Sequence, residues 1–176
     1  MAINQLSLRI LNLFAFLSTV LGILIAIYYF QGYLGLTACP LCIFQRVGLM
    51  GAGLFFLFAA VHNPGPTGIR IYALIGLIPS LFGAGIAIRH IMIQNMPADE
   101  VPACGPDLAY MMEAFPFQKM ITTVLRGSGE CADVQWSLLG LTIPGWVLVT
   151  FVFVILFQLL QLWKGDFLTQ EKKNNL

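Results

Sequence analysis

Residues 10–30 read ILNLFAFLSTVLGILIAIYYF, and no charged residue interrupts them. A helix needs about 20 consecutive apolar residues to cross the hydrocarbon core of a bilayer. This stretch meets that length, and it exceeds the roughly 7–15 apolar residues at the centre of a cleaved signal peptide. It therefore predicts a membrane-spanning helix near the start of the chain.

Three more apolar stretches of similar length follow along the chain. They cover residues 41–61, 69–88 and 144–163. A cluster of Asn, Pro and Gly separates the first two of these, as expected of a short loop between helices. The sequence thus predicts an all-α membrane protein, a four-transmembrane-helix bundle that forms a single membrane domain over residues 1–176.

The overall composition supports this fold class and narrows the function. The chain is 59% hydrophobic and only 10% charged, whereas an ordinary soluble domain is about 25% charged. The net charge of +1 and the lack of a basic stripe give no field that would attract nucleic acid. The lipid bilayer is the expected surrounding, and nucleic-acid binding is excluded.

Four spans place both termini on one side of the membrane, and the basic residues indicate which side. Cytoplasmic segments of membrane proteins carry an excess of Lys and Arg. Such residues flank the termini and the middle loop: Arg9, Arg70, Lys164, Lys172 and Lys173. The bias favours cytoplasmic termini and two periplasmic loops, residues 31–40 and 89–143, on a bacterial inner membrane.

The second periplasmic loop contains a helical pattern of its own. Apolar residues recur there at i, i+3, i+4, i+7 and i+8, which is the spacing of one helical face: Phe117, Met120, Ile121, Val124 and Leu125. This helix is too short to span. We expect it either to lie in the membrane interface or to pack on the ends of the other helices.

The sequence Cys39-Pro40-Leu41-Cys42 is a C-x-x-C motif at the start of the second span. Proline suits the first turn of a helix, so Cys39 is expected at the N-cap and Cys42 in the first turn. Unpaired N–H groups and the helix dipole favour thiolates there, as required for redox exchange. A c-type haem site would need His after the second cysteine, and Ile43 stands there instead.

A second pair of cysteines, Cys104 and Cys131, lies in the longer loop. No metal site is expected, because the spacing of this pair does not match a zinc knuckle. Inert structural disulfides remain an alternative, since the periplasm permits them. Lipid attachment at Cys39 is a weaker alternative, because the preceding LTA tripeptide resembles a lipoprotein processing box but follows a full-length span.

Two further residues are candidates for binding a ligand. Arg46 lies four residues after Cys42, on the same helix face and one turn deeper in the membrane. A charge at such depth usually has a function, here donating hydrogen bonds to a quinone oxygen, although snorkelling to the interface is the alternative. His90 is expected at the depth of the C-x-x-C motif, either assisting the quinone or simply exposed at the interface.

These motifs together resemble the DsbB family of disulfide bond formation proteins. The resemblance rests on the C-x-x-C motif with Arg46, on Cys104 and Cys131, and on the segment ECADVQW at residues 130–136. It extends over nearly the whole chain. Gln45 departs from the pattern, since an acidic residue is expected at its position.

The resemblance implies a protein dithiol:quinone oxidoreductase that sustains disulfide formation in the periplasm. Cys104 would form a mixed disulfide with a soluble, thioredoxin-like periplasmic oxidase of the DsbA type, and Cys131 would resolve it. Cys39 would exchange with Cys131, and Cys42 would face ubiquinone or menaquinone from the membrane pool, held by Arg46 and His90. The alternatives are a membrane scaffold with structural disulfides and a related enzyme with one dedicated partner.

Overall fold

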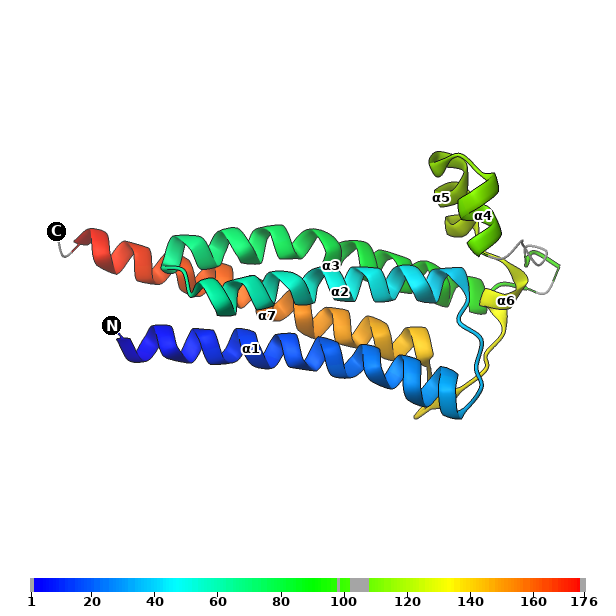
Figure 1. Cartoon of the computed structure of the whole chain (residues 1–176), viewed down its shortest axis with the longest axis horizontal. Helices are drawn as coiled ribbons and strands as arrows, with labels where there is room; N and C mark the ends of the chain where they lie inside the picture. Colours follow the sequence, from blue (N-terminus) through cyan, green and yellow to red (C-terminus); the bar gives the residue numbers. More distant parts are fainter. Residues whose placement is uncertain (1, 98, 102–107, 175–176) are drawn as a thin grey trace.

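The computed structural model describes residues 2–97, 99–101 and 108–174. Four long helices lie side by side: α1 (Ala2–Leu24), α2 (Pro40–His62), α3 (Pro66–Gln94) and α7 (Ile143–Asn174). Within the described residues, four segments are long and apolar enough to cross a membrane. The predicted fold class is therefore confirmed. The start of α1 and the end of α7 lie at the same end of the bundle (Figure 1).

The first spanning segment does not end where the sequence suggests. After α1 the chain continues as a π-helix, η1 (Ile25–Tyr33), so the predicted loop that began at residue 31 begins later. Backbone bonds from Leu34 N to Tyr29 O and from Leu36 N to Phe30 O close its last turns. π-Helical turns are rare and are frequent at functional sites. This one directly precedes the C-x-x-C motif.

The start of α2 follows the local sequence. Cys39 is the N-cap, with extended backbone (φ −65°, ψ 160°), and Pro40 occupies the first turn. The Sγ of Cys39 accepts a hydrogen bond from the Cys42 backbone N–H at 3.4 Å. A capping side chain satisfies one of the N–H groups that the first helical turn leaves unpaired. Cys39 and Cys42 are thus fixed to a rigid helix end.

Small residues bring α2, α3 and α7 into close contact. A Cβ atom on Gly48 of α2 would lie 2.9 Å from the Cα of Gly83 in α3. A Cβ on Gly83 would lie 2.1 Å from the Cζ of Phe151 in α7, and that phenylalanine is fully buried. Membrane helices associate largely through such close van der Waals packing. Gly83 is the position where three helices meet.

We expect Gly83→Ala to lower the stability of the bundle, because the new methyl group must displace the ring of Phe151. Overpacking of this kind typically costs about 1–3 kcal/mol. Gly85→Ala is the matched control on the same helix, since the added methyl group would meet no atom of the described residues within 4 Å. Thermal unfolding in detergent should show a lower midpoint for Gly83→Ala alone. Equal midpoints for the two variants would contradict the packing argument.

Shorter elements gather at the other end of the bundle, which we call the cysteine end because Cys39, Cys42 and Cys131 lie there. They are α4 (Leu108–Ala114), α5 (Phe117–Arg126), α6 (Gly129–Ala132) and a two-stranded hairpin, β1 (Ser137–Leu138) with β2 (Leu141–Thr142). Helix α3 continues to Gln94, past the predicted end at residue 88, because the residues after His90 are again apolar. Figure 1 shows α4 and α5 standing off the bundle axis.

The amphipathic helix expected in the long loop is α5, and it docks on the bundle. Arg89 of α3 donates from Nε to the carbonyl of Leu125 at 3.0 Å and from Nη2 to that of Arg126 at 3.1 Å. Met120 and Val124 are buried against the bundle, whereas Phe117 is 73% exposed. One part of the apolar stripe therefore packs on the helix ends, and another part stays available to the membrane interface.

Candidate thiol redox site

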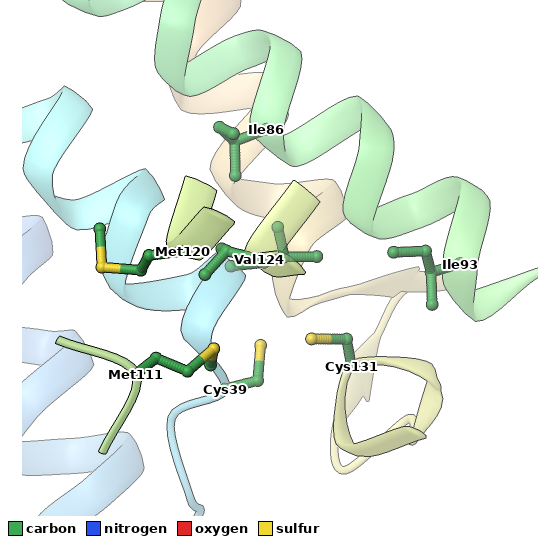
Figure 2. Close-up of a cluster of buried hydrophobic side chains, with 8 residues drawn as sticks. Cys39, Ile86, Ile93, Met111, Met120, Val124 and Cys131 are labelled. Carbon is green, nitrogen blue, oxygen red and sulfur yellow. The ribbon is translucent and has the colours of Figure 1, made fainter. Parts of the chain in front are cut away.

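Three cysteine side chains meet at the cysteine end. The Sγ atoms of Cys39 and Cys42 are 3.1 Å apart. Cys131 reaches them from α6, and Figure 2 shows its sulfur pointing toward that of Cys39. Cys39 and Cys131 are both buried. The structure thus brings one cysteine of the long loop to the C-x-x-C motif, while Cys104 lies outside the described residues.

An apolar layer surrounds these thiols. Cys39 and Cys131 belong to one cluster of buried side chains contributed by four helices and the C-x-x-C motif. Its other buried members are Leu41, Ile86, Ile93, Met111, Met120 and Val124. Such a layer excludes water from the sulfurs, which limits side reactions of exposed thiolates. The docking of α5 is what completes the layer.

His90 lies at the centre of the thiol group. It is only 3% exposed. The alternative that His90 is simply exposed at the membrane interface is therefore wrong. Its Nε2 is 3.8 Å from the Sγ of Cys39 and its Nδ1 is 3.9 Å from the Sγ of Cys42. The Nε2 also lies 3.1 Å from the Cys131 carbonyl oxygen, and the Nδ1 lies 3.2 Å from the Gln45 amide nitrogen. An imidazole in this position can pass protons between the Cys39 and Cys42 thiols.

The tautomer of His90 follows from these two neighbours. When the Gln45 amide donates to Nδ1, the Nε2–H is left to donate to the carbonyl of Cys131, and both contacts are satisfied. Gln45 is itself buried. Gln45, the departure from the expected acidic residue, therefore orients the imidazole through a neutral contact.

Arg46 is held by the end of the first spanning segment. Its Nη1 donates to the Oε1 of Gln31, and its Nη2 donates to the Ala26 carbonyl at 3.4 Å. Both partners belong to η1, whose π-helical turn presents Ala26 and Gln31 to α2. These contacts use only part of the five-donor guanidinium. The other donors can bind a ligand beside the thiols.

A cavity of about 440 Å³ joins these residues. It lies among α1, η1, α2, α3 and α7, and most of the side chains along it are apolar. Cys42, Arg46 and His90 all line it. Ligand-binding cavities are typically apolar with a few well-placed polar groups. The cavity can therefore hold an apolar ring that carries hydrogen-bond acceptors, next to a thiol.

The segment after α6 covers part of this cavity. Trp136 contacts Phe30 edge to face, with ring centroids 5.0 Å apart, and Gln135 donates from Nε2 to the Thr37 hydroxyl at 3.2 Å. Trp136 is the last residue of the segment ECADVQW that carries the family resemblance. It also lines the cavity, where the contact with Phe30 holds it.

The protonation of Cys131 differs from that of an ordinary thiol. A hydrogen bond with the Cys39 side chain, then burial, and then the charge of Cys39 raise the pKa of Cys131 above its usual 9.0. The Ser128 backbone N–H and hydroxyl act in the opposite direction, with the hydroxyl 3.6 Å from the sulfur. Because the thiolate is the reacting species, Cys131 is held in an unreactive form while Cys39 is also reduced and lies beside it.

We therefore expect slow alkylation of Cys131 in the fully reduced protein. Because its pKa is raised, the thiol stays protonated as the pH passes its usual value of 9.0. Iodoacetamide labelling, followed by mass spectrometry from neutral pH to about pH 10, should show the rise in rate only in the denatured chain. Cys39→Ala should speed labelling of Cys131, since it removes the largest cause. Identical rates in the parent and this variant would contradict that cause.

Sequence reasoning missed Gln31, and it noted Gln45 only as a departure from the family pattern, without its contact with His90. Gln31 is flanked by apolar residues, and Gln45 stands next to Arg46 in an otherwise apolar stretch. Polar residues in such surroundings are a signal, because polar groups in a membrane helix usually face a partner or a cavity. Their partners, Arg46 and His90, were not predictable from spacing along the chain.

Fold and site together define a multi-pass membrane protein with the thiols of an oxidoreductase at one end of the bundle. A sequence profile described as disulfide bond formation protein DsbB matches residues 8–161. The chain belongs to this DsbB family, and its role is that of a thiol oxidoreductase in disulfide bond formation.

Three relatives illustrate the match, and each is named disulfide bond formation protein B. The protein of Psychrobacter sp. strain PRwf-1 is 49% identical over 160 residues, which cover 90% of this chain and 94% of the relative. That of Nitrosococcus oceani is 53% identical over 134 residues, with 76% and 79% covered. That of Hahella chejuensis is 54% identical over 125 residues, with 71% and 76% covered.

Proposed function

We propose that this protein oxidises the dithiol of a soluble, thioredoxin-like disulfide oxidase of the DsbA type and passes the electrons to a membrane quinone. The observation that carries the proposal is that Cys42, Arg46 and His90 line one apolar cavity, with Cys131 beside Cys39. The cavity supplies a place for the acceptor, and the adjacent thiols supply the electrons.

The exchange steps combine the closeness of Cys131 to Cys39 (Figure 2) with the roles that the resemblance to the DsbB family implies for Cys104 and Cys42. In the oxidised enzyme, a partner thiolate attacks Cys104 of a Cys104–Cys131 disulfide, which forms the mixed disulfide and releases Cys131. The freed Cys131 attacks Cys39 of the Cys39–Cys42 disulfide and releases the Cys42 thiolate toward the cavity. The second partner thiol then releases the oxidised partner from Cys104. Cys104 finally attacks the Cys39–Cys131 bond, which restores the loop disulfide and leaves the C-x-x-C motif reduced.

The residues around the cavity suit a quinone. A quinone accepts the two electrons and two protons that the reduced C-x-x-C pair gives up, so atoms and electrons balance. The guanidinium of Arg46 has donors to spare for a carbonyl oxygen, and His90 contacts both thiols of the pair. Apolar walls match the ring. This donor set would serve ubiquinone and menaquinone alike.

We place the protein in a bacterial inner membrane, with both termini in the cytoplasm and the cysteine end in the periplasm. Support comes from the basic residues near the termini and the α2–α3 loop and from the shared location of both termini (Figure 1). A membrane-impermeant maleimide added to whole spheroplasts should label reduced Cys104. Labelling only after the membrane is broken would contradict the proposed topology and place the cysteine end in the cytoplasm.

The proposal is tested by coupling the two half-reactions in a purified system. Protein in detergent, a reduced DsbA-type partner and a soluble short-chain quinone are mixed, and quinone absorbance and partner thiols are followed together. We expect one quinone consumed for every partner dithiol oxidised. Oxidation of the partner with no quinone consumed would reject the proposed acceptor, and quinone loss without partner oxidation would reject the proposed donor.

Gln31→Ala is expected to raise the KM for quinone, because Gln31 orients the guanidinium of Arg46. Loss of one hydrogen bond of about 0.5–1.5 kcal/mol corresponds to a rise of roughly two- to tenfold. Gln31→Glu keeps an acceptor for Arg46 and should restore a KM near that of the parent. Steady-state kinetics at several quinone concentrations give the KM and kcat of the parent and both variants. A fall in kcat with unchanged KM in Gln31→Ala would contradict a positioning role.

A further inference from the structure

Cys39, Cys42 and His90, which the proposed redox reaction also uses, form a set of side chains that could together bind a metal ion. One ligand atom from each, two sulfurs and one ring nitrogen, lie within 4.8 Å of one another. Thiolate and imidazole are the ligands preferred by Zn²⁺ and other thiophilic divalent ions. Spacing along the chain does not predict such a metal site, because His90 is far from the C-x-x-C motif in sequence.

The distances suit a tetrahedral ion after a small adjustment. Zn–S bonds of about 2.3 Å and Zn–N bonds of about 2.0–2.1 Å place neighbouring tetrahedral ligands roughly 3.5–3.8 Å apart. The Nε2 of His90 is 3.8 Å from the Sγ of Cys39. The two sulfurs are closer, at 3.1 Å, and a rotation of the Cys42 side chain toward the cavity would separate them.

The surroundings of His90 supply support for a bound metal. With the metal on Nε2, the Nδ1–H would donate to the oxygen of the Gln45 amide, which turns over to present it. Metal-bound histidines almost always donate their second ring N–H to such a partner. The metal would replace the contact between Nε2 and the Cys131 carbonyl oxygen, which are 3.1 Å apart. Cys39, Cys42 and His90 all line the cavity, which leaves room for a water molecule as the fourth ligand.

We propose that the reduced Cys39–Cys42 pair and His90 bind one thiophilic divalent metal ion, with Zn²⁺ as the natural ligand, and that the bound ion arrests the enzyme. Binding converts two thiols to thiolates and releases two protons. A disulfide offers no thiolate, so only the reduced pair binds. The metal holds both sulfurs and the imidazole, and the pair is then unable to give up its electrons.

Metal binding is tested on the full-length protein in detergent, reduced and kept anaerobic, without quinone or partner. Zn²⁺ is titrated in competition with a chromophoric chelator, and Cd²⁺ is added separately to observe its thiolate absorption band. We expect one ion per reduced chain and none per oxidised chain. His90→Ala should weaken binding by at least about tenfold. Binding that is absent, or unchanged in His90→Ala, overturns the proposal.

The double variant Cys104→Ser/Cys131→Ser separates this site from a site made of four cysteines. It keeps all three proposed ligands, so it should still bind one ion with similar affinity. It also removes the need to rely on His90→Ala alone, should that variant fold poorly. Loss of zinc from the double variant would assign the metal to the loop cysteines instead and overturn the ligand set.

The arrest rests on the proposed function, whereas the binding does not. Parent protein turning over partner and quinone should slow in proportion to the fraction of chains that hold Zn²⁺, and a chelator should restore the rate. Full turnover at saturating Zn²⁺ would reject the arrest while leaving the binding in place. A protein that never consumed quinone would instead reject the proposed function, and the titration would remain interpretable.

Discussion

Cys42→Ser protein is expected to oxidise one equivalent of reduced partner and then stop. The proposed loop disulfide between Cys104 and Cys131 would remain able to accept one pair of electrons. The variant lacks the Cys42 thiol, however, and Cys39 alone cannot form the C-x-x-C disulfide that passes electrons to the quinone. Catalytic quinone consumption should therefore fall to the uncatalysed background.

The measurement separates single from multiple turnover. Partner and enzyme are mixed at equal concentrations and then at a large excess of partner, and oxidised partner is counted by mass after acid quenching. Serine replaces sulfur by oxygen in a half-buried position that caps no helix, so the fold should survive, and thermal unfolding checks this. Sustained quinone reduction by Cys42→Ser would exclude the proposed exit for electrons.

The sequence predicts the helix bundle well because the features that produce each helix lie within a short stretch of the chain. Spanning length and lack of charge identify each transmembrane helix independently of the others. The N-cap at Cys39 follows from Pro40 in the same way, since a first-turn proline fixes where the helix begins. Features of this kind need only a short window of sequence.

The site was less predictable because the positions of its side chains depend on contacts between segments that are far apart in the sequence. The burial of His90 depends on α5 and α6 folding back over the end of α3, and the spacing of residues says nothing about that. Arg46 could be assigned a depth from its place in α2, but its contacts with η1 depend on a π-helix with no clear signal in the sequence. The neutral contact from Gln45 emerges only once His90 is in place.

Arg46→Met is expected to raise the KM for quinone by about 10- to 100-fold, because it removes charged donors worth about 1.5–3 kcal/mol and leaves a side chain of similar length. If Arg46 merely snorkelled to the interface, the KM would not change. Its contacts with Gln31 and Ala26 direct it across to η1 instead, beside the cavity that Cys42 lines. The effect should exceed that of Gln31→Ala, which only misorients the guanidinium.

The kinetic pattern distinguishes loss of ligand binding from loss of structure. Arg46→Lys keeps the charge but not the planar fork, so its KM should fall between those of the parent and Arg46→Met. The single oxidation of partner through the loop cysteines should proceed at the parental rate in both variants, because the proposed loop step does not use Arg46. If Arg46→Met slowed the loop step as much as quinone reduction, its role would be to hold η1 against α2, and the acceptor would have to be bound by other residues.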